Sequence, residues 1–410
     1  MARLFRIRWF MDFLLTALLA CAALGLIVSP KETAAAAREG FALCVDVILP
    51  SLFPFFVISA LTIELGLTRR PGALLEPVMR PLFRLSGPCS AAVVLGFLGG
   101  YPVGAKTAIS LYESGLCDRE EAERLLAFCN NSGPAFILGA VGTGILGSSA
   151  AGWLLYLTHT AASLTVGVLF RFYKRKDKRG APRAAETGAG PRAPGRRPVR
   201  LSEAFTRSVK SSFSSVFYIS AFVIFFTVTV RLLFLSGLLP GAAQGLGGLL
   251  GVSACTVEQW LTGCIELTGG LWSLRGDATE FLAGKMAMAA FMLGWAGLSV
   301  HCQVLSFIGG SGLSARAYIA GKLLHGLISA AYTALVMSVS GLSVPVSGVI
   351  AEQVEGLAGM RFTSTLLMTL GIGAGVFLAF LLGAAPGWRR RGRRVSTFDA
   401  FPHTIKMRKP

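Results

Sequence analysis

Apolar residues occur in long runs along the chain, and eight of these runs approach or exceed the roughly 20 helical residues needed to cross a bilayer core about 30 Å thick. They cover residues 9–29, 41–65, 122–148, 149–170, 212–238, 281–309, 317–340 and 363–385. Their length and low charge predict an all-α polytopic membrane protein with about eight transmembrane helices. The first run follows Arg3, Arg6 and Arg8 and also fits a signal peptide, but its length and the apolar sequence after it favour a retained crossing.

Two further apolar stretches contain too many helix-breaking residues for one continuous crossing. Residues 89–110 include Pro102 and several glycines, and residues 255–275 include the pair Gly269 and Gly270. Proline removes a backbone donor, and glycine weakens the helical hydrogen-bond ladder. Each stretch is therefore predicted to form a re-entrant helical hairpin whose tip is buried against protein rather than lipid.

The composition supports the membrane class, since 53% of the 410 residues are hydrophobic and 15% are charged. The net charge of +18 is concentrated in three segments: residues 1–8 carry +3, residues 171–200 carry +9 and residues 386–410 carry +7. The rest of the chain is nearly neutral. A nucleic-acid-binding domain needs a basic face on a folded module, so no nucleic-acid partner is expected.

The basic segments also predict the orientation, because loops rich in Lys and Arg stay on the cytoplasmic side of a membrane. An N-terminus inside places the linker at 171–207 and the tail at 386–410 in the cytoplasm. The linker has no periodic apolar residues and is predicted to be disordered. It separates an N-terminal membrane half, residues 1–170, from a C-terminal membrane half, residues 208–385.

Two of the crossings, 122–148 and 281–309, contain polar interruptions. The first interruption is Asn130-Asn131-Ser132-Gly133-Pro134, and the second is the polar group Ser299, His301 and Gln303, which follows Gly294 and Gly297. Both crossings are therefore predicted to be broken helices, each following one of the hairpins.

The spacing of hairpins and breaks is the same in both halves. Gly100 and Asn131 are 31 residues apart (131 − 100), as are Gly270 and His301 (301 − 270). In the orientation above, the two hairpins enter the membrane from opposite faces. We therefore expect an inverted repeat, an architecture typical of secondary transporters, whose substrate site lies between the repeats.

Broken helices leave N–H groups free at the start of one half-helix and carbonyl groups free at the end of the other. A polar substrate can replace its water with these groups. The expected substrate-binding residues are Gly99, Gly100, Tyr101, Lys106, Asn130, Asn131, Ser132, Glu266, Thr268, Gly269, Gly270, Ser299, His301 and Gln303. For any single glycine the alternative is a kink or close helix packing, whereas the cluster at 130–134 favours binding.

Ionisable residues at membrane depth are costly and are candidates in their own right. Lys106 either faces an anionic substrate or extends to the lipid headgroups. Glu266 either binds a proton, a cation or a donor group, or it stabilises its hairpin. His301 is a substrate donor, a titrating switch or a helix-to-helix hydrogen bond. Glu64 and Lys285 are expected near the membrane surfaces.

Catalytic and metal-binding motifs are not recognisable. The glycine pattern at 139–144 superficially matches a nucleotide-binding loop, but it lies inside an apolar crossing with no preceding strand. The eight cysteines have no CxxC pair and no zinc-like spacing with histidine, and most lie in apolar stretches. They are interpreted as apolar fillers rather than as a disulfide framework. We expect no enzyme activity, no metal and no cofactor.

Residues 96–148 carry a resemblance to a known family. Their segments GGYPVGAK, EEAERLL and NSGPAFILGAVG resemble the YlbJ (SpoVV) family of sporulation integral membrane proteins, within the nucleoside-recognition or Gate domain proteins. Length and layout agree across the chain, and the second half resembles the family less sharply. The resemblance implies a fold related to concentrative nucleoside transporters and transport of dipicolinic acid from the mother cell across the outer forespore membrane.

The implied substrate, dipicolinate, is a planar dianion. Lys106 and the side chains of Asn130, Asn131 and Ser132 would suit its carboxylates. Two other functions stay open: a carrier for a nucleoside or another small solute, and a non-transporting scaffold that assembles sporulation proteins through the basic loop and tail. The expected partners are the lipid bilayer and a small organic anion, while a coupling ion and a homo-oligomer are left open.

Overall fold

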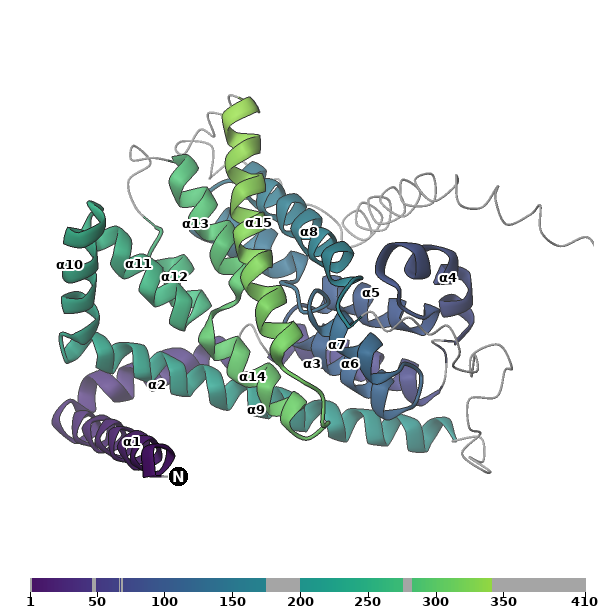
Figure 1. Cartoon of the computed structure of the whole chain (residues 1–410), viewed down its shortest axis with the longest axis horizontal. Coiled ribbons are helices and arrows are strands. Elements are labelled where there is room, and N and C mark those ends of the chain that lie inside the picture. Colours follow the sequence, from purple (N-terminus) through teal and green to yellow (C-terminus); the bar gives the residue numbers. More distant parts are fainter. Residues whose placement is uncertain are drawn as a thin grey trace, which may run out of the picture. The chain divides into compact units, whose positions relative to one another are not determined.

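The computed structural model describes residues 2–45, 49–65, 67, 69–174, 200–275 and 282–340, and each regular element in these ranges is a helix (Figure 1). The predicted all-α class is confirmed for this part of the chain. The predicted crossing 363–385, the basic tail and most of the predicted linker lie outside the described residues.

The N-terminal segment consists of α1 (Ala2–Val28), α2 (Pro30–Leu43) and α3 (Leu49–Glu64). The chain bends by 102° between α1 and α2, where Pro30 occupies the first turn of α2. Proline is favoured there because a backbone N–H in the first turn has no partner within the helix, so the helix loses no hydrogen bond when proline lacks it. The predicted crossing 41–65 falls on the end of α2 and on α3, and residues 46–48 between them lie outside the described residues.

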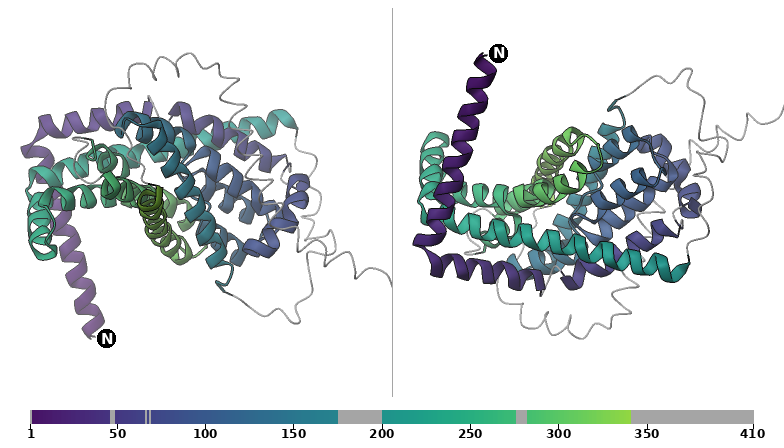
Figure 2. Two further views of the ribbon diagram at one scale, coloured as in Figure 1. Left: turned by 90° about the horizontal axis from the view of Figure 1, so that it is seen from above. Right: turned by 90° about the horizontal axis from the view of Figure 1, so that it is seen from below.

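A long helix, α9 (Leu201–Leu235), lies along α2 and α3 (Figure 2). Its 35 residues make it about 50 Å long at 1.5 Å per residue, which exceeds the bilayer core. It starts earlier than the predicted crossing 212–238. Small residues such as Ala204, Ser208 and Ser212 are buried on it, and their size allows neighbouring helices to approach closely.

The predicted hairpin at 89–110 is observed as two helices that pack against each other. The two helices are α5 (Ser90–Gly99) and α6 (Val103–Glu113), and they follow α4 (Arg69–Phe83) and the short η2 (Gly87–Cys89). The chain reverses between α5 and α6, where Gly100 has a φ of +79°. This left-handed conformation favours glycine because it carries no Cβ.

Helix α7 (Arg119–Leu126) begins with a reciprocal cap. The Asp118 carboxylate accepts from the Glu121 N–H, and the Glu121 carboxylate accepts from the Asp118 N–H. This capping box satisfies two backbone donors that the helix start leaves free. It explains why a short polar helix stands before the interrupted segment.

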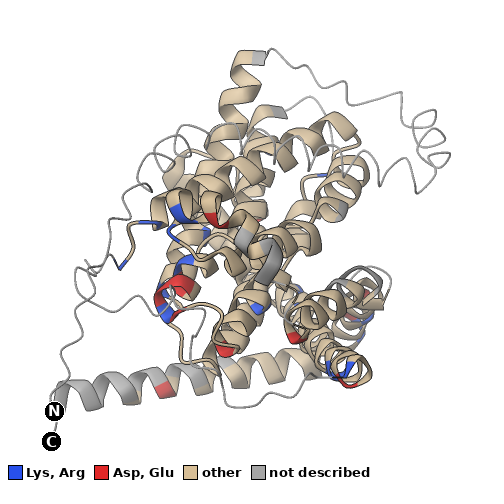
Figure 3. Cartoon of the chain, turned by 90° about the vertical axis from the view of Figure 1, so that its right-hand side faces the viewer, with Lys and Arg blue, Asp and Glu red and all other residues tan. Residues whose placement is uncertain are grey.

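The buried carboxylate of Glu123 on α7 connects three parts of the chain. It accepts hydrogen bonds from Arg119 on its own helix (3.1 Å), from Lys174 after α8 (2.5 Å) and from the backbone N–H of Ser314 (3.1 Å). The hydrogen bond to Glu123 raises the pKa of Lys174. Other charged residues are sparse on the described helices, which are mostly coloured tan for uncharged residues in Figure 3.

The predicted interruption of 122–148 is confirmed. After α7 and a short turn, residues 130–133 are not helical, and a π-helix, η3 (Ala135–Ile145), precedes α8 (Ser149–Phe170). A π-helix of this length is rare, and π-helical turns often occur at functional sites.

The second half contains α10 (Leu238–Leu250), α11 (Ala254–Ile265), α12 (Leu267–Trp272), α13 (Leu282–Trp295), α14 (Gly297–Gly309) and α15 (Arg316–Ser340). Helix α10 was not predicted. Helices α11 and α12 pack against each other at the predicted hairpin 255–275. The chain turns at Glu266, however, and Gly269 and Gly270 lie inside α12.

The interruption predicted in 281–309 was placed wrongly. The break lies at Ala296, whose φ is +76°, and Ser299, His301 and Gln303 all lie inside α14. Polar side chains leave the backbone ladder of a helix intact, whereas a left-handed residue interrupts it. The second hairpin turns at Glu266, and Gly297 follows Ala296 at the break. These two residues are 31 positions apart (297 − 266), which is the spacing predicted from the sequence.

Four described helical segments are long and apolar enough to cross a membrane, and six are reached if each of two bent pairs is counted as one span. The four are Ser149–Phe170, Leu201–Leu235, Ala283–Gly309 and Arg316–Val339. The predicted number of eight is not reached among the described residues. The predicted crossing 122–148 is divided, and residues 46–48 of the crossing 41–65 and the whole of 363–385 lie outside those residues.

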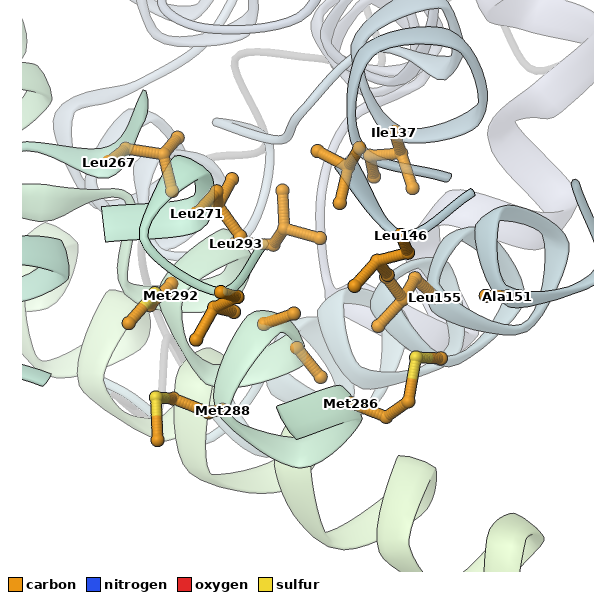
Figure 4. Close-up of a cluster of buried hydrophobic side chains, with 14 residues drawn as sticks. Ile137, Leu146, Ala151, Leu155, Leu267, Leu271, Met286, Met288, Met292 and Leu293 are labelled. Carbon is orange, nitrogen blue, oxygen red and sulfur yellow. The ribbon is translucent and has the colours of Figure 1, made fainter. Parts of the chain in front are cut away.

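A buried apolar core joins the two halves. Ile137 on η3 and Leu155 on α8 pack in one cluster with Leu271 on α12 and with Met286 and Leu293 on α13 (Figure 4). Helix α15 packs against both α13 and α8. This packing fixes the interrupted segment of the first half beside helices of the second half.

Candidate functional site

The non-helical segment after α7 holds the backbone of the candidate site. The carbonyl oxygen of Asn130 accepts a hydrogen bond from the ammonium group of Lys322 on α15 at 3.0 Å. Both residues are fully buried. A helix interruption leaves carbonyl groups without helical partners, and here one of them binds a buried lysine.

Two glycines allow other helices to approach this segment closely. A Cβ on Gly104 of α6 would lie 1.9 Å from the carbonyl oxygen of Cys129, and a Cβ on Gly321 of α15 would lie 2.2 Å from that of Ala127. No side chain fits at such distances. The hairpin α5–α6 and helix α15 therefore both pack directly against the backbone that leads into the interruption.

Two histidines continue the hydrogen bonds from Lys322. Its ammonium nitrogen lies 3.4 Å from Nδ1 of His325, and Nε2 of His325 lies 2.9 Å from the carbonyl oxygen of His159 on α8. The backbone N–H of Ser132 in turn donates to Nε2 of His159 at 3.1 Å. The interruption is thus held at its carbonyl side by Lys322 and at its N–H side by His159.

Helix α14 and the hairpin contribute from the other side. Nδ1 of His301 lies 2.9 Å from the hydroxyl of Tyr318, which also accepts a 3.5 Å contact from the side-chain amide of Asn130. The hydroxyl of Tyr101, at the hairpin turn, donates to the carbonyl oxygen of Leu293. The ammonium group of Lys322 lies 5.2 Å from the centre of the Tyr101 ring, a cation–π distance.

These contacts define a central polar cluster. Its members are Tyr101, Asn130, Ser132, His159, His301, Tyr318, Lys322 and His325. Tyr318, Lys322 and His325 share one face of α15, because residues three and four apart in a helix are neighbours. The same buried face continues with Ser329 and Thr333.

Lys322 forms no ion pair with a carboxylate among the described residues, although its side chain is fully buried. Removing an ammonium ion from water costs several kcal/mol unless an opposite charge and hydrogen bonds replace the water. Two hydrogen bonds are present, to the carbonyl oxygen of Asn130 and to Nδ1 of His325.

Several polar atoms of the cluster have no hydrogen-bond partner within the described part of the chain. They are Oδ1 of Asn130, Oδ1 of the neighbouring Asn131, Oγ of Ser132, Nδ1 of His159 and Nε2 of His301. A buried polar atom without a partner costs about 1–3 kcal/mol. Their concentration at one place is typical of a site that binds a polar ligand or water.

Comparison with known proteins supplies the family. A family model for nucleoside recognition, Gate, matches residues 45–173, which include the α5–α6 hairpin and the interruption. The chain is also 32% identical over 323 residues to the sporulation integral membrane protein YlbJ of Bacillus subtilis strain 168, with 75% of this chain and 78% of that protein aligned. The chain belongs to the YlbJ family.

Membership of the YlbJ family and the long apolar helices make this an integral membrane protein. No solved structure matches the chain. Lys322, His325 and His301 lie outside the segment matched by the Gate model. The cluster therefore combines the Gate segment with residues from the second half of this YlbJ-family protein.

The structure places the predicted site residues of the first half in different surroundings. Tyr101, Asn130 and Ser132 belong to the cluster, while the side-chain amide of Asn131 donates to the carbonyl oxygen of Phe128 at 3.0 Å. Gly99 and Gly100 form the hairpin turn. Lys106 points to α9, where it donates to the carbonyl oxygen of Ser211 (3.1 Å) and to the hydroxyl of Ser215.

In the second half, His301 alone of the predicted residues has a hydrogen bond to the cluster. The carboxylate of Glu266 accepts from the backbone N–H groups of Thr268 (3.0 Å) and Gly269 (2.6 Å), so it caps α12. A Cβ on Gly270 would lie 2.1 Å from Cα of Gly263. Helices α11 and α12 therefore pack too closely for a side chain at position 270.

The remaining predicted residues lie elsewhere on the described helices. Ser299 and Gln303 are buried on α14. Glu64 ends α3, and Lys285 lies near the start of α13. No group of three His, Cys, Asp or Glu side chains within the described ranges is arranged to hold a metal ion.

Sequence reasoning missed His159, Tyr318, Lys322 and His325. The signal was present, since three of them are ionisable at membrane depth inside the predicted crossings 149–170 and 317–340. The spacing of Tyr318, Lys322 and His325 also places them on one helix face. Both crossings lack interruptions, so the pattern of helix breaks does not point to them.

Proposed function

We propose that this protein is a membrane carrier that binds dipicolinate at the central polar cluster and moves it from the mother cell across the outer forespore membrane. The proposal rests chiefly on Lys322, a fully buried lysine without a carboxylate partner among the described residues. A small anion supplies the missing opposite charge, and an ion pair in a low-dielectric site is far stronger than in water.

The surroundings of Lys322 favour an organic acid over an inorganic ion. The Tyr101 ring lies beside the ammonium group, and the His301 ring lies edge-on to Trp295 with ring centres 4.2 Å apart. Aromatic rings pack against a planar ring such as that of dipicolinate, while the hydrogen-bonding groups between them suit its carboxylates.

The architecture is consistent with a carrier. Two helical hairpins and two interrupted helices meet around buried polar residues, as in transporters with inverted repeats. We retain the inverted repeat, cytoplasmic termini and the division at the basic linker as parts of the proposal. Because the residues of the cluster are buried, substrate entry requires the helices around it to move.

A nucleoside carrier is the second candidate, favoured by the nucleoside-recognition model that matches residues 45–173. A nucleoside is uncharged, however, and leaves the charge of Lys322 unbalanced. It would use the free side-chain oxygens of Asn130 and Asn131 as acceptors for its hydroxyl and amino groups.

Uptake into vesicles that contain the purified protein tests the proposal. We expect saturable uptake of radiolabelled dipicolinate that excess unlabelled dipicolinate inhibits and excess uridine leaves unchanged. Inhibition by uridine with no dipicolinate uptake would favour the nucleoside carrier. A third outcome, no uptake of either together with loss of sporulation on deleting residues 176–198, would favour the scaffold.

A further inference from the structure

Two buried histidines on different helices each have one ring nitrogen engaged and the other free. Nε2 of His159 accepts from the backbone N–H of Ser132 at 3.1 Å. A backbone amide can only donate, so Nε2 carries no proton and the neutral ring has its proton on Nδ1. That Nδ1 is buried and has no hydrogen-bond partner within the described ranges.

The same reasoning gives the opposite tautomer for His301. The side-chain amide nitrogen of Asn130 can only donate to the hydroxyl of Tyr318. Among the described residues, Nδ1 of His301, at 2.9 Å, is the acceptor available for the hydroxyl proton of Tyr318, so we assign that proton to this hydrogen bond. The proton of His301 then lies on Nε2, which is buried and also lacks a partner among the described residues.

The rings of the two histidines contact α15 on either side of Lys322 along the helix. The His301 ring contacts Tyr318, and the His159 ring lies 4.3 Å from the His325 ring, measured between centres. Tyr318 and His325 are seven residues apart on α15, a rise of about 10 Å, and Lys322 lies between them. This rise along α15 is comparable with the length of a six-membered ring that carries two carboxylates and has a hydrogen bond at each end.

We infer that His159 and His301 bind the two carboxylates of one dianion, through Nδ1–H and Nε2–H respectively, while Lys322 between them supplies positive charge. This inference rests on the proposed function and names the groups that select a dicarboxylate. A monocarboxylate leaves one buried donor unpaired, which weakens its binding by about 10- to 100-fold.

Crossed amide substitutions test the inference, because an asparagine amide reaches the position of Nδ1 and a glutamine amide reaches that of Nε2. His159→Asn and His301→Gln keep a donor at the free position. His159→Gln and His301→Asn move it away. The readout is the ratio of the affinities for dipicolinate and picolinate, which has a single carboxylate, measured by calorimetry on the purified full-length protein in nanodiscs.

We expect the first pair of variants to retain a 10- to 100-fold preference for dipicolinate and the second pair to lose most of it. If wild type prefers dipicolinate and the four variants retain equal preferences, the inference fails while the proposed function stands. If wild type binds neither acid, both fail. A purely structural role for the histidines would lower both affinities together and leave their ratio unchanged.

Nitrogen NMR of the wild-type histidine rings gives a second test that does not depend on a variant folding. The inference expects the proton of His159 on Nδ1 and that of His301 on Nε2, with dipicolinate shifting the signals of these two nitrogens. The reverse tautomers, or signals unmoved by bound dipicolinate, would overturn it.

Discussion

The ammonium group of Lys322 lies 3.0 Å from the carbonyl oxygen of Asn130, so a helix of the second half binds the interrupted segment of the first half through a buried charge. A close approach at Gly321 brings α15 against this segment. The same lysine contacts the hairpin turn through Tyr101. One residue therefore connects the hairpin, the interruption and α15.

Ligand binding at Lys322 predicts a thermal shift. Dipicolinate at about 100 times its dissociation constant stabilises the folded protein by about 2.7 kcal/mol through mass action, so the melting temperature rises by several degrees. Lys322→Met removes the charge that attracts the anion and should show little or no shift. The exposed Lys210 on α9 provides a matched control, and Lys210→Met should respond like wild type. Equal shifts in all three proteins would exclude Lys322 from the site.

The contact between α15 and the interrupted segment predicts a strong dependence on Gly321. Its Cβ in Gly321→Ala would meet the Ala127 carbonyl oxygen at 2.2 Å, so overpacking should destabilise the protein by about 1–3 kcal/mol. Gly241 on α10 has open space around its added Cβ. Gly241→Ala should be neutral or stabilising by up to about 1 kcal/mol. Chemical or thermal unfolding in detergent measures the stability of both variants. Equal changes in stability for Gly321→Ala and Gly241→Ala would contradict the close packing at Gly321.

The connection through Glu123 predicts a loss of stability in Glu123→Gln. The amide keeps the shape but loses the charge that binds Arg119, Lys174 and the Ser314 N–H, at a cost of about 1–3 kcal/mol. Exposed Glu203 on α9 serves as control, and Glu203→Gln should have little effect. Unfolding of the two variants should differ clearly at neutral pH.

The raised pKa of Lys174 adds a dependence on pH. A raised folded-state pKa means that the pair stabilises the protein below the unfolded pKa of the lysine, and that this stability is lost as pH rises through the folded value. The difference between wild type and Glu123→Gln should therefore persist at neutral pH and narrow at strongly alkaline pH. A difference that narrows on moderate acidification, while Glu123 is still ionised, would contradict this reading.

The cap at α12 predicts that Glu266 contributes to stability. Glu266→Ala leaves the N–H groups of Thr268 and Gly269 without their acceptor and should cost about 0.5–2 kcal/mol. Glu266→Asp retains a good N-cap and should recover part of it. Glu258 on the adjoining α11 is the control, because it starts no helix. A loss in Glu258→Ala as large as that in Glu266→Ala would refute the capping role.

Sequence patterns predicted the first half of the fold well where backbone chemistry was decisive. Gly100 adopts a positive φ at the turn of the α5–α6 hairpin, and the segment from Asn130 to Gly133 is not helical. Glycine and proline alter the backbone directly, so their effects are visible in one sequence. The second break was predicted at the polar residues that follow Gly294 and Gly297, whereas it lies at Ala296 and Gly297, both with a φ of +76°. Gly297 carries a backbone signal, but Ala296 does not.

The candidate site was only partly predictable for a different reason. Asn130, Ser132 and His301 attracted attention as polar residues near expected breaks, but Lys322 and His159 lie on regular helices. Their importance comes from the packing of α15 and α8 against the interruption, which joins residues about 190 positions apart. A single sequence gives no information on such pairings.

The most direct test of the central claim is the initial rate of dipicolinate uptake into vesicles containing equal amounts of folded wild-type protein, Lys322→Met or Lys210→Met. The account predicts saturable uptake by wild type and Lys210→Met and at least a 10-fold lower rate with Lys322→Met, since an ion-paired contact to the anion contributes about 1.5–3 kcal/mol. Uptake by Lys322→Met at the wild-type rate would contradict it.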